Sequence, residues 1–198
     1  MTDPVMQESQ SPDTSKGSNS SILLYTVLAI GLALVVRFFV AAPYLVSGPS
    51  MEPVFENHDY LIVDRLSYNF GTPERGDVII FTLPQNPSET LIKRVIGIPG
   101  DTVSITDAKV TIANAAHPDG FLLSEPYIDP NDLGGASGMR VTVGPDHYFV
   151  LGDNRKVSFD SRLWGMLPRE NIIGRVFIRL YPLNAIGTLP GKARYSTQ

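Results

Sequence analysis

The longest apolar run of the chain constrains its fold more than any other feature. The run extends over 21 residues from Ile22 to Ala42, and its first fifteen residues, Ile22 to Val36, carry no charge. An α-helix of this length spans about 31 Å, which is close to the thickness of the hydrocarbon core of a bilayer. Pro43 follows and disfavours helical backbone in the residue before it. We therefore predict a single transmembrane anchor helix over residues 22–42.

The residues before the run favour an anchor over a cleaved secretory signal. A secretory signal begins with basic residues and has an apolar core of about 7 to 15 residues. Here the preceding tail has one lysine, Lys16, against three acidic residues, and the apolar run is longer. A helix buried in a soluble domain stays as an alternative. Residues 1–21 contain no apolar run that could offset the entropy lost on ordering, so they are predicted to be a disordered tail.

Beyond the run, short apolar stretches alternate with polar residues in the pattern of β-strands. The eight predicted strands are Tyr60–Val63, Asp77–Leu83, Leu91–Ile98, Thr102–Ile105, Lys109–Ala113, Arg140–Val143, Tyr148–Leu151 and Ile173–Tyr181. Pro168–Asn171 is a candidate helical turn. Residues 43–198 therefore predict one mainly β domain. Within it, the segment from about 101 to 146 is rich in Asp, Gly, Pro and Ala, and we expect inserted hairpins and loops there.

Composition excludes several kinds of chemistry. The 198 residues include no cysteine, so a thiol nucleophile, a disulfide and a cysteine-ligated zinc site are excluded. The three histidines, His58, His117 and His147, lack the spacing of metal ligands, so no metal site is predicted and no cofactor is expected. The net charge of -4, with no cluster of lysine and arginine, argues against nucleic acid as a partner.

Ser50 is a candidate nucleophile. It lies in the segment Ser47-Gly48-Pro49-Ser50-Met51-Glu52-Pro53, just after the predicted anchor, where one glycine and two prolines turn the backbone sharply. Such a turn can present a hydroxyl group outward with its own N–H beside it, as an acyl-transfer nucleophile with part of an oxyanion hole requires. Most such segments are simple turns, so the interpretation needs a base close to Ser50.

Lys93 is the candidate base. Leu91, Lys93 and Val95 share one face of a predicted strand, so the lysine has apolar neighbours on its own side. Loss of hydration lowers the pKa of an ammonium group, and a shift to about 7 needs roughly 4 to 5 kcal/mol and nearly complete burial. We expect no histidine beside Ser50, and the chain has no cysteine, so a desolvated lysine is the plausible partner for a serine nucleophile. A lysine that reaches solvent at a sheet edge is the alternative.

Residues 152–165 form a polar cluster directly after the predicted strand Tyr148–Leu151. Asp160 and Arg162, with serines before and between them, could form a hydrogen-bonded layer behind a Ser/Lys pair. Such a pair needs a hydroxyl group that holds the amine within hydrogen-bond reach of the serine oxygen. A solvated loop is the alternative.

Four sequence blocks resemble, in order, the signature motifs of type I signal peptidases, the membrane-bound serine endopeptidases that remove secretory signal peptides. The blocks are Ser50-Met51-x-Pro53, Arg75-Gly76-Asp77-Val78, Lys93-Arg94-Val95-Ile96-Gly97-Ile98-Pro99-Gly100-Asp101 and Gly152-Asp153-Asn154-Arg155-x-x-Ser158-x-Asp160-Ser161-Arg162. The resemblance is to the single-anchor form, and it implies a β-barrel-like catalytic domain with Ser50 as nucleophile and Lys93 as general base.

The resemblance also implies supporting roles. Ser158 corresponds to the hydroxyl group that orients the lysine, and Asp160 and Arg162 correspond to a structural ion pair behind it. Met51 corresponds to the residue that helps to shield the lysine from solvent.

The resemblance further implies an oxyanion hole and a substrate cleft. Gly48 stands where some relatives have a serine that donates to the oxyanion, so the Ser50 N–H is the first donor and Gly48 only a candidate second one. The positions implied to bind an extended substrate are Tyr44, Val46, Leu91 and Ile92.

Location and partners also follow from the resemblance. It implies a cytoplasmic N-terminus and a catalytic domain on the outer side of the plasma membrane, or of a thylakoid membrane in a cyanobacterium. Lys16 and Arg37 flank the run on opposite sides, so the positive-inside rule does not fix this orientation. The implied partners are precursor proteins with signal peptides, the lipid bilayer and the secretion machinery.

Other functions stay open. A membrane-anchored Ser/Lys protease with different substrates would use the same chemistry. A non-catalytic anchored β-domain that assists assembly would explain the anchor and the strands, but not why Ser50, Lys93 and Ser158 occur together. A soluble self-cleaving repressor with a Ser/Lys pair would need a DNA-binding module before the β domain, and the acidic tail does not provide one.

Overall fold

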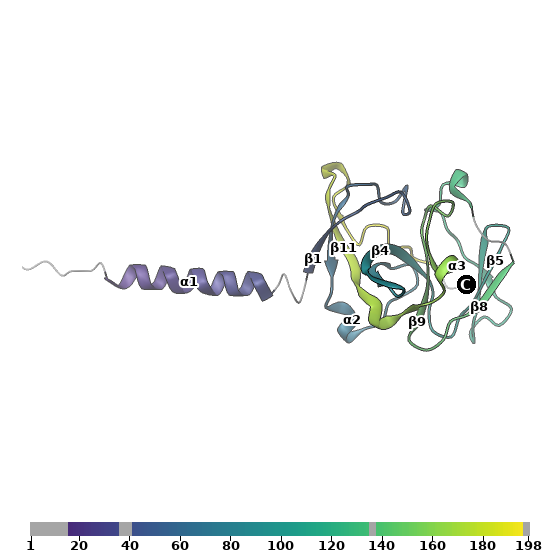
Figure 1. Ribbon diagram of the computed structural model, residues 1–198, viewed down its shortest axis with the longest axis horizontal. Coiled ribbons are helices and arrows are strands. Elements are labelled where there is room, and N and C mark those ends of the chain that lie inside the picture. Colours follow the sequence, from purple (N-terminus) through teal and green to yellow (C-terminus); the bar gives the residue numbers. More distant parts are fainter. Residues whose placement is uncertain (1–15, 36–40, 135–137, 196–198) are drawn as a thin grey trace, which may run out of the picture. The chain divides into compact units, whose positions relative to one another are not determined.

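The computed structural model describes residues 16–35, 41–134 and 138–195, and the chain divides into two units, residues 1–38 and 39–198 (Figure 1). In the first unit, helix α1 (Lys16–Val35) begins inside the predicted disordered tail, so that prediction is wrong for residues 16–21. A helix that forms in the apolar run can extend outward because each further residue adds one backbone hydrogen bond without the cost of a new nucleus. The start of the tail, residues 1–15, lies outside the described residues.

No helix in the described ranges combines the length and the apolar character that a membrane crossing requires. The predicted end of the anchor helix is also wrong, because Ala41 and Ala42 belong to strand β1 (Ala41–Leu45). Pairing with the neighbouring strand β2 (Tyr60–Asp64) satisfies this backbone, and Pro43 is tolerated because β1 is an edge strand. Residues 36–40, between α1 and β1, are outside the described ranges.

The larger sheet of the second unit contains eight antiparallel strands. Its order is β1, β2, β11 (Ile172–Tyr181), β3 (Val78–Leu83), β4 (Asn86–Gly97), β9 (His147–Leu151) and β10 (Leu167–Pro168), with β12 (Gly187–Thr188) beside β11. Strand β4 pairs with β3 on one side and β9 on the other, so it lies inside the sheet. The order of the described strands is open from β1 to β10, so the β-barrel-like domain that the resemblance implies is not a closed barrel in the described sheet.

A smaller sheet occupies the segment in which hairpins and loops are expected. Its order is β7 (Phe121–Leu122), β6 (Lys109–Ala113), β5 (Thr102–Thr106) and β8 (Met139–Thr142). The short helices are α2 (Ser67–Phe70), α3 (Ser161–Trp164), η2 (Pro130–Asp132), η3 (Arg169–Asn171) and η4 (Leu183–Ala185). The labels in Figure 1 show β5 and β8 next to each other, away from β1 and β11.

The eight predicted strands all occur, as β2, β3, β4, β5, β6, β8, β9 and β11; β6 has the predicted ends, and each of the others is shifted at one end or both. The turn predicted at Pro168–Asn171 is η3. The structure adds the short strands β1, β7, β10 and β12, which are too short or too poor in alternation to be predicted. The domain is therefore mainly β.

One core cluster fixes the part of the fold that carries Ser50. Its buried members are Val46, Met51, Phe55, Leu61, Val63, Val78, Ile80, Ile92 and Val176. Met51 and Phe55 have no exposed surface and lie in the turn that follows Ser50. Burial of side chains of this size contributes about 1.5 to 3 kcal/mol each, so the turn is packed onto the sheet.

Candidate active site

The Ser50 turn is fixed on both sides of the serine. Gly48 has a φ of +91°, a left-handed conformation that favours glycine, and its N–H donates to Asn57 Oδ1 at 3.1 Å. After the serine, the Phe55 N–H donates to the Met51 carbonyl at 2.9 Å. The Ser50 carbonyl accepts from the Asn154 N–H at 3.1 Å, which joins the turn to the polar cluster at residues 152–165.

Lys93 lies on β4 with its amine against the serine. Its Nζ is 2.8 Å from Ser50 Oγ and 2.8 Å from the Ile92 carbonyl oxygen, and the residue is only 2% exposed. Burial lowers the pKa of Lys93 to about 8, while the negative charges of Asp160, Asp153 and Glu89 oppose this shift. In its ammonium form the lysine donates to the serine oxygen, and in its neutral form its lone pair can accept the hydroxyl proton.

Ser158 is buried close to this pair, but the orienting hydrogen bond implied by the resemblance is absent. Ser158 Oγ has no hydrogen-bond partner among the described residues. Lys93 Nζ instead donates to the carbonyl of Ile92, its neighbour in the strand.

Gly152 makes room for both serines. A Cβ at this position would overlap Ser158 Oγ and the Ser50 carbonyl oxygen. Only a glycine therefore lets the two serines approach each other here, a requirement that the sequence pattern did not reveal.

Asp160 and Arg162 form a two-point ion pair with Nε–Oδ1 and Nη2–Oδ2 distances of 2.7 and 2.8 Å. Asp160 is fully buried and also accepts from the Gly152 N–H at 3.1 Å. Arg162 donates from Nη2 to the Arg155 carbonyl at 2.8 Å. The pair thus ties together the loop that carries Gly152 and Ser158.

A second buried ion pair was not assigned from the sequence. Arg94, the residue after Lys93, has no exposed surface and donates to both carboxylate oxygens of Asp153, at 2.8 and 2.5 Å. Its guanidinium carbon lies 3.9 Å from the centre of the Tyr127 ring. The signal for this pair was the alternation of β4, which places Arg94 between apolar side chains and therefore calls for a buried acidic partner.

A narrow cavity of about 160 Å³ opens beside the serine and the lysine. Its lining residues are Tyr44, Leu45, Val46, Ser47, Ser50, Ile80, Thr90, Leu91, Ile92 and Lys93. The four positions implied for substrate therefore share one cavity with the candidate nucleophile and base. Gly48 does not line it, and its N–H donates to Asn57 Oδ1, so a second oxyanion donor at Gly48 stays a prediction.

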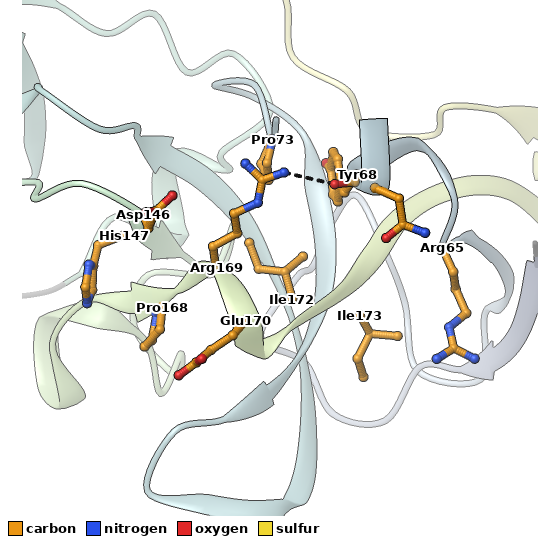
Figure 2. A pocket seen from close by; sticks show the side chains of 11 residues that line it. Arg65, Tyr68, Pro73, Asp146, His147, Pro168, Arg169, Glu170, Ile172 and Ile173 are labelled. Atoms are coloured by element: carbon orange, nitrogen blue, oxygen red, sulfur yellow. Dashed lines mark hydrogen bonds between the residues drawn. The ribbon is translucent and has the colours of Figure 1, made fainter. Parts of the chain in front are cut away.

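A larger cavity of about 660 Å³ lies elsewhere and contains neither Ser50 nor Lys93 (Figure 2). Two arginines and two acidic residues line it, and Arg169 Nη2 donates to the Tyr68 carbonyl at 2.9 Å. The described residues contain no group of three His, Asp or Glu side chains that could hold a metal ion. The narrow cavity, in which a serine lies beside a buried lysine, is therefore the candidate active site, and its arrangement is that of a serine hydrolase.

Known proteins identify the family to which the chain belongs. The family model described as "Signal peptidase, peptidase S26" matches residues 20–181. The chain is 41% identical over 191 residues to the signal peptidase I of Leptolyngbya laminosa, covering 90% of this chain and 89% of the relative. It is 33% identical over 204 residues to the probable signal peptidase I-2 of Synechocystis sp., covering 98% and 88%. The chain therefore belongs to the signal peptidase family, peptidase S26, and is a peptide-bond hydrolase.

A crystal structure of a signal peptidase I from Enterococcus faecalis aligns with a TM-score of 0.44 and 31% sequence identity, covering 54% of this chain and 97% of that chain.

Proposed function

We propose that this chain is a membrane-anchored signal peptidase that cleaves signal peptides from precursor proteins with Ser50 as nucleophile and Lys93 as general base. The observation that carries the proposal is the 2.8 Å approach of Lys93 Nζ to Ser50 Oγ at a lysine that is only 2% exposed. A charged amine at this distance could not activate the hydroxyl, whereas a neutral amine can.

The reaction begins when neutral Lys93 removes the hydroxyl proton as Ser50 Oγ attacks the scissile carbonyl carbon. The N–H of Ser50 stabilises the oxyanion that forms. The protonated lysine then gives its proton to the leaving amine, and an acyl-enzyme remains on Ser50. Neutral Lys93 next activates a water molecule that hydrolyses the ester, so the mechanism needs no metal and no organic cofactor.

Substrate selection is assigned to the narrow cavity. Signal peptides end in a small-x-small pattern, and a shallow apolar pocket beside Ser50 would select that pattern by excluding larger side chains. The substrate lies extended between the segment Tyr44–Gly48 and the strand that leads to Lys93, with Tyr44, Val46, Leu91 and Ile92 in contact with it. Ser158, Asp160 and Arg162 are assigned the role of supporting the lysine.

Anchoring is the remaining part of the proposal. The apolar residues from Ile22 onward hold the chain in the membrane, with the N-terminus in the cytoplasm and the catalytic domain outside, facing the precursors that the secretion machinery delivers. Support comes from the uncharged run itself, whose side chains from Ile22 to Leu34 are all exposed in the described helix. The plasma membrane, or a thylakoid membrane, is the proposed location.

The test uses the purified full chain in lipid vesicles with several precursor proteins, and mass spectrometry maps the new N-termini. Ser50→Ala and Lys93→Met should each abolish cleavage. Ser88→Ala and Lys109→Met, which change an exposed serine and an exposed lysine, should leave it intact. A serine-reactive inhibitor should label Ser50 in the unchanged chain.

The outcomes separate the candidate functions. Cuts after small-x-small sites support a signal peptidase, while cuts elsewhere point to a protease with other substrates. An absence of cleavage and of labelling would indicate a non-catalytic domain. Extraction of the vesicles with alkaline carbonate tests the anchor, and release of the chain into the supernatant would reject it.

A further inference from the structure

The C-terminal segment, residues 187–195, crosses the catalytic domain beyond the stretch that the family model matches, which ends at residue 181. It begins as β12, which pairs with β11, and the Leu189 N–H donates to the Phe177 carbonyl at 2.6 Å. Further on, the Ala193 N–H donates to the Gly76 carbonyl at 3.2 Å. We call residues 187–195 the C-terminal strap.

The strap contacts the strand that carries the base. The Gly191 carbonyl accepts a hydrogen bond from Nη1 of Arg94, the residue next to Lys93. Arg94 is fully buried, so this carbonyl satisfies a donor that water cannot reach. At the end of the strap, the Tyr195 and Tyr127 hydroxyl oxygens are 2.8 Å apart, and the Tyr127 ring lies over Arg94.

The same glycine contacts the turn that carries the nucleophile. A Cβ built on Gly191 would lie 2.7 Å from Val54 Cγ1 and 2.9 Å from Phe55 Cε2, both closer than ordinary van der Waals contact. Both residues follow Ser50 in its turn, and Phe55 is fully buried. The φ of Gly191 is +73°, where a side chain adds strain.

Gly191 therefore lies close to the Ser50 turn and, through Arg94, contacts the strand that carries Lys93. Ser50 and Lys93 are 43 residues apart in the sequence, so their contact depends on how a turn and a strand are held against each other. Lys192 fixes the strap in place through ion pairs with Glu74 and Asp77 at 2.7 and 3.1 Å.

We propose that Gly191 is a positioning residue, through which the C-terminal strap holds the Ser50 turn and the Lys93 strand at the separation that catalysis requires. The proposal rests on the Ser/Lys mechanism above. A side chain at position 191 pushes Val54 and Phe55 away, so the Ser50 turn shifts, the path from Oγ to Nζ lengthens and water reaches the lysine.

The test compares Gly191→Ala with Gly187→Ala in the full chain. Gly187 lies in the same strap, but a Cβ there would meet no atom within 4 Å. For each variant, kcat, KM and the pH at the midpoint of the acidic limb of kcat/KM are measured with a precursor-derived peptide, and thermal unfolding gives the folded fraction.

Gly191→Ala should lower kcat about tenfold or more with little change in KM, because small displacements of reacting groups are costly. The midpoint of its acidic limb should rise by about 0.5 pH unit or more as the lysine becomes hydrated. Gly187→Ala should match the unchanged chain. Adding Val54→Ala removes the nearest obstructing atoms and should restore part of the lost kcat.

The proposal is overturned if Gly191→Ala and Gly187→Ala have the same kcat and the same midpoint of the acidic limb. It is also overturned if the loss of kcat in Gly191→Ala equals its loss of folded protein while the midpoint of the acidic limb is unchanged. Should Gly191→Ala not fold, the double variant replaces it, and if neither folds the strap serves folding and not positioning. Ser50→Ala and Lys93→Met are measured in parallel. If they stay active, the Ser/Lys mechanism itself fails, whereas if they are inactive and Gly191→Ala is normal, only the role of Gly191 is rejected.

Discussion

Raising the pH from 7 to 9 should increase kcat/KM about tenfold, because only the neutral amine of Lys93 can accept the serine proton. With a pKa of about 8 for this residue, the neutral fraction is about 9% at pH 7, about 50% at pH 8 and about 91% at pH 9. The ratio of the last to the first gives the factor of about ten. At the ordinary lysine pKa of 10.5, the rate would instead still be rising steeply at pH 9.

The size of the shift follows from competing effects at the site. A change from 10.5 to about 8 is about 2.5 pH units, or about 3 kcal/mol against the charged form. Loss of hydration supplies the shift, and the carboxylates of Asp160, Asp153 and Glu89 reduce it. The pKa of Lys93 is therefore sensitive to any change that admits water or leaves one of these acids without its partner.

The assay is a cleavage series with a peptide that has no titratable group between pH 6 and 10. Thermal unfolding at each pH confirms that the chain stays folded. Lys109→Met is the control, since Lys109 is exposed and its loss should leave the acidic limb of the kcat/KM profile at the same pH. A rate that does not change with pH, or a limb near 10.5, would refute the argument that a buried neutral lysine is the base.

Three further changes test the buried lysine and its surroundings. Lys93→Met should raise the free energy of unfolding by up to about 3 kcal/mol at pH 7, because it removes a charge that is costly to bury. The pKa of Lys93 is lower in the folded chain than in the unfolded chain, so between pH 8 and 10.5 the unfolded chain binds more protons and the chain with Lys93 gains stability as the pH rises. Denaturant titration should therefore show the difference in stability between the chain with Lys93 and the Lys93→Met variant shrinking over this range. Gly152→Ala should lower kcat more than a hundredfold because its Cβ overlaps the two serines, while Gly144→Ala, whose Cβ has 4.0 Å of clearance, should be neutral in the same assay. Arg162→Met leaves the Asp160 carboxylate buried without its partner, so unfolding should become easier by about 3 to 5 kcal/mol in denaturant, and the acidic limb should move to higher pH; unchanged values in either measurement would contradict the ion-pair argument.

Most strands could be predicted because their burial alternates along the chain. In β2 and β6 every second side chain is buried, as the period of a strand requires. Strand β1 could not be found in this way, because Ala41 and Ala42 continue an apolar run that favours a helix, and only pairing with β2 makes them extended. Tertiary pairing thus overrides the local pattern at this edge.

The contact between Ser50 and Lys93 could be predicted because the chain offers few alternatives. It has no cysteine, and no histidine lines the cavity beside Ser50, so a lysine is the candidate base that remains. Gly152 and Gly191 could not be assigned, because the need for a glycine depends on atoms from distant segments. The contact of Gly191 with Arg94 joins residues 97 positions apart, and no local pattern encodes it.

The buried ion pairs explain how a lysine can lose its charge beside two acids. Asp153 and Asp160 both raise the pKa of Lys93, and each is bound at two points by its own arginine, Arg94 or Arg162. Each pair presents little net charge to the lysine, so the cost of burial dominates and the amine becomes neutral near pH 8. Arg94 also joins β4 to the Gly152 loop through Asp153, while Arg162 holds that loop together through Asp160 and the Arg155 carbonyl. The polar network therefore fixes the geometry around the lysine without restoring the charge of its amine.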